Sequence, residues 1–175
     1  RLALVEKGTV DAAEVLTSGG YGYSKGFDLF FNDRVLLKNL EYQLSYTYNI
    51  AKRKFQEYTE LTTPQYATQH NASLVLKYSI PRIGTIVGLT NRFSSGRPYH
   101  NPDLPGLMND HVKPYNSLDL GLTFLPSKKV IIHASATNIL CRKNEFGRVN
   151  NKAILASNDH FFYIGVFITL GKKAA

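Results

Sequence analysis

Seven stretches of the chain alternate apolar and polar side chains over about the length of a strand that crosses a membrane. The clearest is 40–51, where the apolar residues are Leu40, Tyr42, Leu44, Tyr46, Tyr48 and Ile50 and the polar ones are Glu41, Gln43, Ser45, Thr47 and Asn49. Because successive side chains of a strand point to opposite faces, such a segment has one apolar face and one polar face. Strands of transmembrane barrels show this pattern, with aromatic residues near the ends of the lipid-facing row.

The connections between the predicted strands alternate between short and long. The strands are expected at 21–31, 40–51, 71–80, 83–93, 117–124, 130–140 and 161–170. The short connections are 32–39, 81–82 and 125–129, and the long ones are 52–70, 94–116 and 141–160. Outer-membrane barrels keep short turns in the periplasm and long loops outside, whereas a soluble sandwich has no reason to sort its turns by length. The sequence therefore predicts an all-β antiparallel meander of about seven to eight strands. The last segment is apolar on both faces, so its facing stays open.

The chain has 175 residues and a formal net charge of +8. Basic residues gather near the predicted turns and loop bases, at Lys52, Arg53 and Lys54, at Lys128 and Lys129, at Arg142 and Lys143, and at Lys172 and Lys173. This placement suits strands whose middles lie in hydrocarbon and whose ends lie in water or among lipid phosphates. Nucleic acid is not an expected partner, because the sequence shows neither a stacking platform nor a basic helix.

No targeting segment and no membrane-spanning helix are evident in the sequence. Residues 1–11 lack the charged start, apolar stretch and cleavage site of a secretory signal. No apolar run reaches the roughly 18 residues that a membrane-spanning helix needs. Since the chain starts at Arg1, we interpret it as a piece of a longer protein.

Catalysis and metal binding find little support. There is no Gly-x-Ser-x-Gly elbow, no His-Glu-x-x-His helix and no phosphate-cradling glycine-rich turn. The lone Cys141 can form no disulfide within the chain and has no metal-ligand spacing. We therefore predict that the chain is not an enzyme and needs no cofactor and no metal.

Five segments carry a family resemblance. They are Gly20 to Leu29 (GYGYSKGFDL), Leu44 to Asn49 (LSYTYN), Asn91 to Tyr99 (NRFSSGRPY), Tyr115 to Leu122 (YNSLDLGL) and Val130 to Gly147 (VIIHASATNILCRKNEFG). In this order they resemble the last third of a TonB-dependent outer-membrane receptor of the Bacteroides type of Gram-negative bacteria. The most specific pieces are Ser94 to Tyr99 and Thr137 to Leu140.

The resemblance implies a transmembrane barrel of about 22 strands with a plugged lumen. In such receptors, an amino-terminal plug domain is pulled by the periplasmic TonB protein, and the cargo is a siderophore, a metal chelate, a vitamin or a glycan. Residues 1–175 would be the carboxyl-terminal part of this barrel, with residues 1–5 as the tail of an eighth strand, and the plug domain and earlier strands would lie outside it. The family tends to end on an aromatic residue, whereas here Leu170 is followed by Gly171 and Lys172. This departure leaves the register of the last strand open.

The long connection 94–116 holds the residues that we predict to contact substrate at the mouth of the barrel. They are Arg97, Tyr99, His100, Asp103, Asn109, Asp110 and His111. The alternative is an ordinary solvated loop in which Gly96-Arg97-Pro98 only makes a turn. The same two histidines and two aspartates lack the tight spacing of metal ligands, so solvated side chains are the expectation there.

The polar rows of the strands are expected to line the lumen. The candidates are Glu41, Gln43, Lys77, Arg92 and Asp119, which would line a transport path, grip the plug or hold one another in the wall. Lipid of the outer membrane is then the partner of the apolar rows. An isolated piece with unpaired edges is expected to self-associate or to need detergent. One rival interpretation is a small soluble β-barrel ligand-binding module with its apolar rows turned inward. Another is an outer-membrane barrel enzyme, which would require a carboxylate or a Ser together with a His at the loop bases.

Overall fold

The computed structural model describes residues 2–7, 14–55, 58, 60–149, 152–156 and 159–171. The strands are β1 (Leu2–Lys7), β2 (Glu14–Asp33), β3 (Leu40–Lys54), β4 (His70–Ile80), β5 (Thr85–Ser94), β6 (Pro98–Tyr99), β7 (Asp110–His111), β8 (Tyr115–Ser127), β9 (Val130–Thr137), β10 (Glu145–Val149), β11 (Lys152–Leu155) and β12 (Phe161–Ile168), with a 3-10 turn at Pro81–Ile83. Within these ranges no helix is long and apolar enough to span a membrane.

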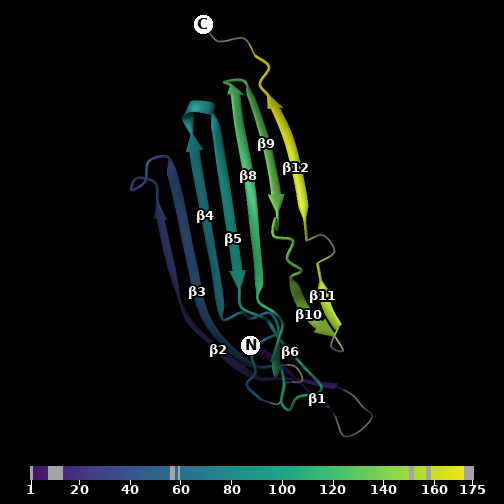
Figure 1. The fold of residues 1–175 in the computed structure, drawn as a ribbon. Helices are drawn as coiled ribbons and strands as arrows, with labels where there is room; N and C mark the ends of the chain where they lie inside the picture. The colour runs from purple at the N-terminus through teal and green to yellow at the C-terminus, as the bar shows by residue number, and fades with distance from the viewer. Residues whose placement is uncertain are drawn as a thin grey trace.

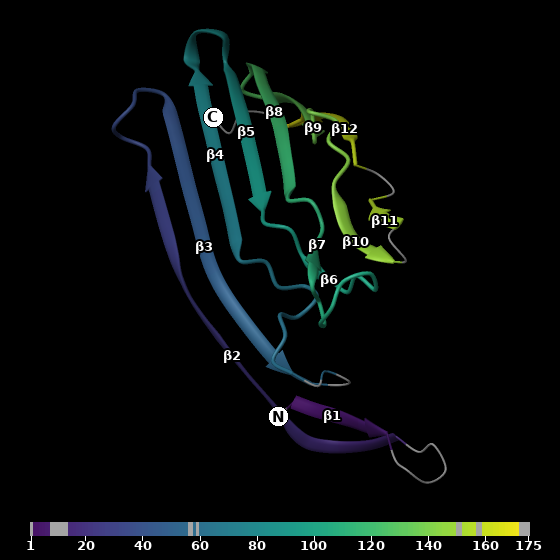
Figure 2. The same cartoon turned by 60° about the horizontal axis from the view of Figure 1, so that its bottom comes forward.

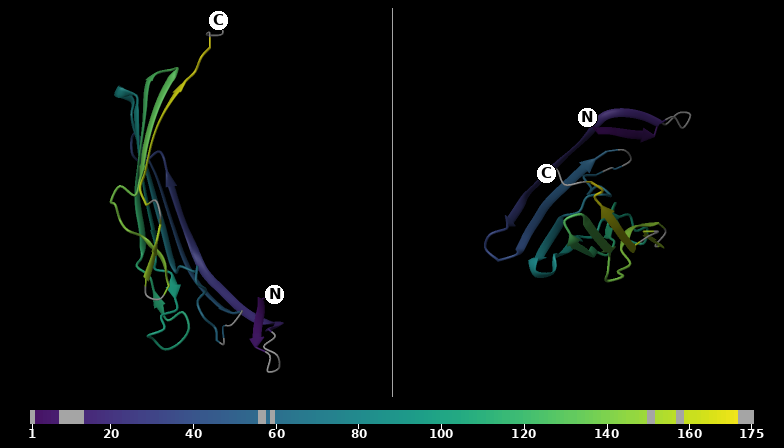
Figure 3. Two further views of the ribbon diagram at one scale, coloured as in Figure 1. Left: turned by 90° about the vertical axis from the view of Figure 1, so that its right-hand side faces the viewer. Right: turned by 90° about the horizontal axis from the view of Figure 1, so that it is seen from above.

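Eight strands form one antiparallel sheet in the order β1-β2-β3-β4-β5-β8-β9-β12. The sheet is a single curved layer in which neighbours in sequence are neighbours in space (Figures 1 and 3). All the long connections lie at one end, at the bottom of Figure 1, and the short turns lie at the other. Figure 2 shows the two small hairpins, β6–β7 and β10–β11, close together at the long-loop end. The predicted all-β meander with sorted loops is confirmed.

The strand register aligns the apolar rows on one face of the sheet. Leu44 of β3 pairs with Phe31 of β2 and Leu74 of β4. Leu89 of β5 pairs with Leu76 and Leu120. The pairing of β12 with β9 decides the facing that the sequence left open, because it places Phe162, Ile164, Val166 and Ile168 beside Ala136, Ala134, Ile132 and Val130 on the same apolar face.

This apolar face is uncovered. Among the residues with described side chains, the buried hydrophobic ones are Ala51, Tyr99 and Val112. Phe162 and Ile164 are each 75% exposed, although an isolated soluble domain normally buries such side chains. An apolar surface of this extent marks contact with lipid or with another protein. The soluble-barrel interpretation does not fit, because the sheet order ends at β1 and β12 without closing. Self-association of the isolated chain stays a prediction.

Aromatic residues mark both ends of the apolar row on β2, β3 and β4. Tyr42 contacts Phe31 near the short turns, with 5.7 Å between ring centroids. Tyr48 contacts Phe27 and His70 toward the long loops, at 5.7 and 5.2 Å. Residues Leu40 to Ile50 extend over about 33 Å along the strand. A strand tilt of about 40° reduces this to about 25 Å, the height of the apolar band of outer-membrane barrels.

Several boundaries differ from the sequence-based prediction. β2 starts at Glu14 rather than 21, β8 continues past Pro126 to Ser127, and β9 ends at Thr137 rather than 140. The continuation of β8 is made possible by a shift of register between Phe124 and Ser127. The tail of an eighth strand, predicted at residues 1–5, corresponds to β1. Residue 1 lies outside the described residues.

Candidate functional site

The polar face of the sheet is hollowed where two long loops fold over it. The cavity, which we call the wall pocket, has a volume of about 360 Å³. Its floor comes from Ser45 and Thr47 of β3, Asn71 and Ser73 of β4, and Arg92 and Ser94 of β5. Its roof comes from Arg97, Lys113, Glu145 and Phe146 of the loops. The pocket is of a size that holds a small ligand.

The five lumen-wall candidates all lie on this polar face. Glu41 faces Lys77 across the β3–β4 pair, with Oε2 3.5 Å from Nζ. Arg92 donates to Asp119 across the β5–β8 pair, with Nη1 2.5 Å from Oδ2. Gln43 lies on the same face, two residues along β3 from Glu41. The charged candidates therefore pair across neighbouring strands, and of the five only Arg92 lines the wall pocket. That these residues face a lumen stays a prediction.

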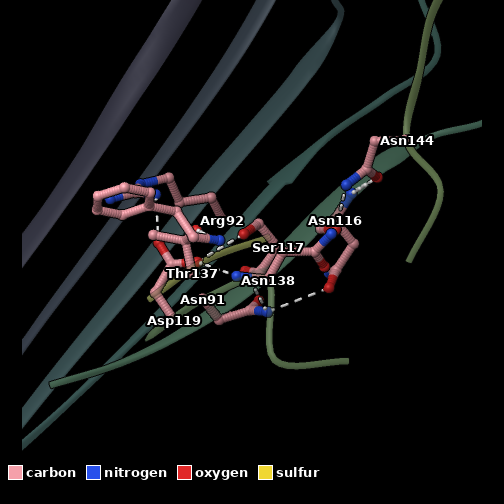
Figure 4. Close-up of polar contacts among 9 residues, drawn as sticks. Asn91, Arg92, Asn116, Ser117, Asp119, Thr137, Asn138 and Asn144 are labelled. Carbon is pink, nitrogen blue, oxygen red and sulfur yellow. Dashed lines mark hydrogen bonds and ion pairs between the residues drawn. The ribbon is translucent and has the colours of Figure 1, made fainter. Parts of the chain in front are cut away.

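Asp119 connects the wall to the start of the last long loop. Its Oδ1 accepts a hydrogen bond from Ser117 Oγ at 2.7 Å and another from the backbone N–H of Asn138 at 2.9 Å. Figure 4 shows the carboxylate among Arg92, Ser117 and Asn138. Ser117 and Asn138 are 4% and 3% exposed, so these bonds are shielded from water. The carboxylate thus fixes the point where the chain leaves β9.

Asn138 shapes the turn that follows. Its backbone is left-handed, with φ of 47°, a conformation that Asn tolerates better than most residues. Its side chain donates to the Arg142 carbonyl at 2.8 Å and accepts from the Arg142 N–H at 3.2 Å. The carbonyl of Asn138 also lies 3.1 Å from His160 Nδ1, at the far end of the loop. One asparagine therefore holds both ends of the loop 138–160.

Asn144 attaches this loop to β8. Its side-chain amide accepts from the backbone N–H of Asn116 and donates to the Asn116 carbonyl, both at 3.0 Å (Figure 4). Asn144 is 2% exposed. Asn116 pairs with Phe93 of β5 on one side, whereas the pairing of β8 with β9 on the other side starts only at Leu120. The amide therefore takes the place of a strand on the β9 side and satisfies two backbone groups that would otherwise be unpaired.

Glu145 and Phe146 join the two long loops to one another. Glu145 accepts from Arg148 Nε and Nη2, both at 3.1 Å, and Lys113 Nζ lies 3.5 Å away. The Arg97 guanidinium lies 5.7 Å from the ring centroid of Phe146, and Arg148 lies 5.7 Å from that of Tyr99. Of these groups, Arg97 and Lys113 bring positive charge to the roof of the wall pocket, and Glu145 brings negative charge.

The seven predicted substrate contacts do not form one cluster. Arg97 lines the wall pocket. Tyr99, Asn109 and Asp110 are used inside the loop, where Tyr99 Oη donates to Asp110 Oδ2 at 2.6 Å and Asn109 donates to the Leu104 carbonyl at 2.6 Å. The other three residues lie exposed on the loop surface; they are His100, Asp103 and His111.

Hydrogen bonds lower the pKa of Asp110 to about 2. The largest cause is the bond from Tyr99, followed by those from Asn101 and the His111 backbone. The same bond to Asp110 raises the pKa of Tyr99. Since the carboxyl pKa is depressed in the folded loop, ionised Asp110 stabilises the loop above its ordinary pKa of 3.8, and this contribution is lost as the pH falls toward 2.

Tyr99→Phe is expected to make the loop more sensitive to acid. Without the phenol donor, the pKa of Asp110 should rise toward 3.8, so that at about pH 3 much of the carboxyl is protonated and the β6–β7 pair loosens. Limited pepsin digestion at that pH should cut the 94–116 loop faster in the variant. Tyr66→Phe, at a side chain that is 77% exposed, is the control. Equal cleavage of Tyr99→Phe and the unmodified protein would contradict this account.

Sequence reasoning missed the residues that join the loops. Each of Asn138, Asn144, Glu145 and Arg148 has a partner distant in sequence, beside the local contacts of Asn138 with Arg142 and of Glu145 with Arg148. No local pattern reveals the distant partners. The signal in the sequence was the resemblance carried by Val130 to Gly147, which contains Asn138, Asn144 and Glu145. Within the described residues, no group of three or more His, Cys, Asp or Glu side chains could hold a metal ion. Cys141 is exposed in the same loop.

No protein-family model and no curated protein sequence matches the chain. Solved structures of similar fold include the outer membrane transporter YddB from Escherichia coli, with a TM-score of 0.69 and 13% identity over 95% of this chain and 28% of that one. Another is the ferric-catecholate import receptor Fiu from E. coli K12, with a TM-score of 0.68 and 12% identity over 93% of this chain and 23% of that one. The likeness establishes the fold, and the chain spans about a quarter of the length of each.

Proposed function

We propose that this chain forms part of the barrel wall of an outer-membrane receptor that binds and imports a nutrient. The observation that carries the proposal is the asymmetry of the sheet. One face is apolar, uncovered and bounded by aromatic residues such as Tyr42 and Tyr48, and the other is polar and roofed by the long loops at one end. A lipid-facing wall with a wet interior has this construction.

We propose further that the receptor is TonB-dependent and of the Bacteroides type. The similarity of the sheet to parts of YddB and Fiu supports a barrel wall of this kind. The partners would then be outer-membrane lipid, a plug domain inside the barrel and the periplasmic TonB protein. The cargo would be a siderophore, a metal chelate, a vitamin or a glycan. Residues 1–175 would be the carboxyl-terminal segment of the barrel.

The wall pocket is the best candidate on this chain for contact with the cargo. Arg97 contacts the Phe146 ring, and none of the five ion pairs among the described residues includes it. Its guanidinium can therefore offer several N–H donors in a fixed geometry to a ligand. The role proposed for the pocket is binding and not catalysis.

The proposed function predicts on which side of the outer membrane each loop lies, and this can be tested in whole cells. A membrane-impermeant maleimide should modify the native Cys141, which is exposed in a long loop, and the modified peptide should be detected by mass spectrometry. In a Cys141→Ser background, His100→Cys in the 94–116 loop should also react. Arg82→Cys in the short turn should react only after the outer membrane is opened.

The Cys141→Ser protein without a new cysteine controls for modification elsewhere. If Arg82→Cys reacted in intact cells while His100→Cys did not, the orientation would be inverted. Equal reaction at both positions would remove the argument from sorted loops.

A further inference from the structure

Three lysines lie on the apolar face of the sheet at its long-loop end. Lys52 and Lys54 of β3 pair with Tyr23 and Tyr21 of β2, and Lys25 of β2 pairs with Ile50. The register of this pair is unbroken from Tyr21 to Asp33, so the three lysines share a face with Leu44. We call them the lysine row.

The lysine row lies just beyond the part of the face suited to hydrocarbon. Ile50 ends the apolar run on β3, and the ring contacts of Tyr48 with Phe27 and His70 mark the aromatic boundary one step before it. Lys25 lies beside Ile50, and Lys52 and Lys54 follow by one and two further positions on the same face. Side chains at this depth reach the headgroups of the adjoining lipid leaflet.

Among the described residues, no carboxylate forms an ion pair with the lysine row. Lys25 Nζ lies 5.9 Å from the ring centroid of Tyr23, which leaves its N–H groups available. At the opposite end, the same face of β2 and β3 presents Asp33 and Leu40 in place of cations. The positive charge on this face of β2 and β3 is therefore confined to the long-loop end.

We propose that the lysine row binds the phosphate groups of phosphorylated lipid in the leaflet at the long-loop end. The proposal rests on the proposed function, because it requires the apolar face to meet a bilayer. Clustered lysines attract anionic headgroups, and each contributes a roughly fivefold gain in affinity near a membrane surface. The tyrosines between them, Tyr21 and Tyr23, are 57% and 48% exposed and provide the amphipathic surface on which headgroups rest.

The test titrates the intact protein in neutral detergent with lipid A, a phosphorylated glycolipid, and follows bound lipid by native mass spectrometry. The variant carries Lys25→Gln, Lys52→Gln and Lys54→Gln together. Its affinity for lipid A should fall on the order of 100-fold, whereas its affinity for dephosphorylated lipid A should be unchanged. The triple Lys→Arg variant should keep the affinity, because the charges remain.

Arg53→Gln is the matched control, since Arg53 lies in the same strand on the polar face and lines a different hollow beside Ser24 and Asn49. It should leave lipid A binding within about twofold of the unmodified protein. Unchanged affinity in the triple Gln variant, or an unmodified protein that binds both lipids alike, would overturn the proposal. The labelling of Cys141 in intact cells does not depend on lipid binding by the lysine row. The two experiments therefore distinguish a failure of the lipid proposal from a failure of the proposed barrel function.

Discussion

Leu44→Arg is expected to prevent assembly of the barrel or to destabilise it by about 2 to 4 kcal/mol, the cost of an arginine at the bilayer midplane. Leu44 lies midway along the apolar row of β3, between Phe31 and Leu74, and is 46% exposed on the uncovered face. Gln43→Arg, one residue away, places the same charge on the polar face and should be tolerated, because that side chain is exposed toward Asn32 and Val75.

The comparison is made in the intact protein, by its yield in the outer membrane and by the temperature at which the barrel unfolds on gels. The two variants differ only in the face that carries the charge, so their difference isolates the facing of the sheet. If Gln43→Arg proved the more damaging, the polar face and not the apolar face would meet hydrocarbon, and the proposed facing of the sheet would be wrong.

Much of the sheet could be predicted because each strand carries its own pattern. From Leu40 to Ile50 in β3 and from Ala72 to Ile80 in β4, every second residue is apolar, and the period of two predicts both the strand and its facing. The alternation of short and long connections then predicted the antiparallel order of the strands. The start of β2 was missed because Gly19 and Gly20 interrupt the alternation there, and its pairing with β1 replaces the missing local signal.

The last strand shows where a local pattern is not enough. Both faces of β12 are apolar, with Phe161 and Phe167 on the polar face of the sheet and Phe162 and Ile164 on the other. Only the register with β9 distinguishes the two sets, and that register depends on a partner separated by the whole last loop. No single segment of the sequence therefore reveals which face of β12 is the apolar face of the sheet.

The candidate site was less predictable than the sheet. The loop 94–116 could be identified by its length and polarity, but the roles of its residues depend on the other loop. Tyr99 is buried and contacts Asp110 and Arg148, whereas Arg97 packs against the ring of Phe146. Because Arg148 and Phe146 belong to the other loop, the sequence of 94–116 alone does not tell which of its side chains form contacts within the protein. The β10–β11 hairpin was missed because its strands are short and lack alternation.

Asp119→Ala is expected to release the last long loop from the wall. The carboxylate accepts from Arg92, from Ser117 and from the Asn138 N–H, and the last two donors are shielded from water. Bonds from shielded donors to a charged group contribute about 1.5 to 3 kcal/mol each. Arg92 is 55% exposed, so its ion pair adds little. Ser117 lies in β8 like Asp119, so only the bond from Asn138 joins the wall to the loop. The free energy of opening the loop should therefore fall by about 1.5 to 3 kcal/mol.

Trypsin reports this opening, because Arg142 and Lys143 lie in the turn that Asn138 holds closed. When opening is fast relative to cleavage, the rate follows the open population, so cleavage there should accelerate about 10- to 100-fold in Asp119→Ala. Asp119→Asn is the matched control. Its side-chain oxygen can still accept from Ser117 and Asn138, so its rate should rise by less than about tenfold. Equal acceleration in both variants would mean that the charge of Asp119, and not its hydrogen bonds, holds the turn closed. No acceleration in either variant would show that Asn144 anchors the loop without Asp119.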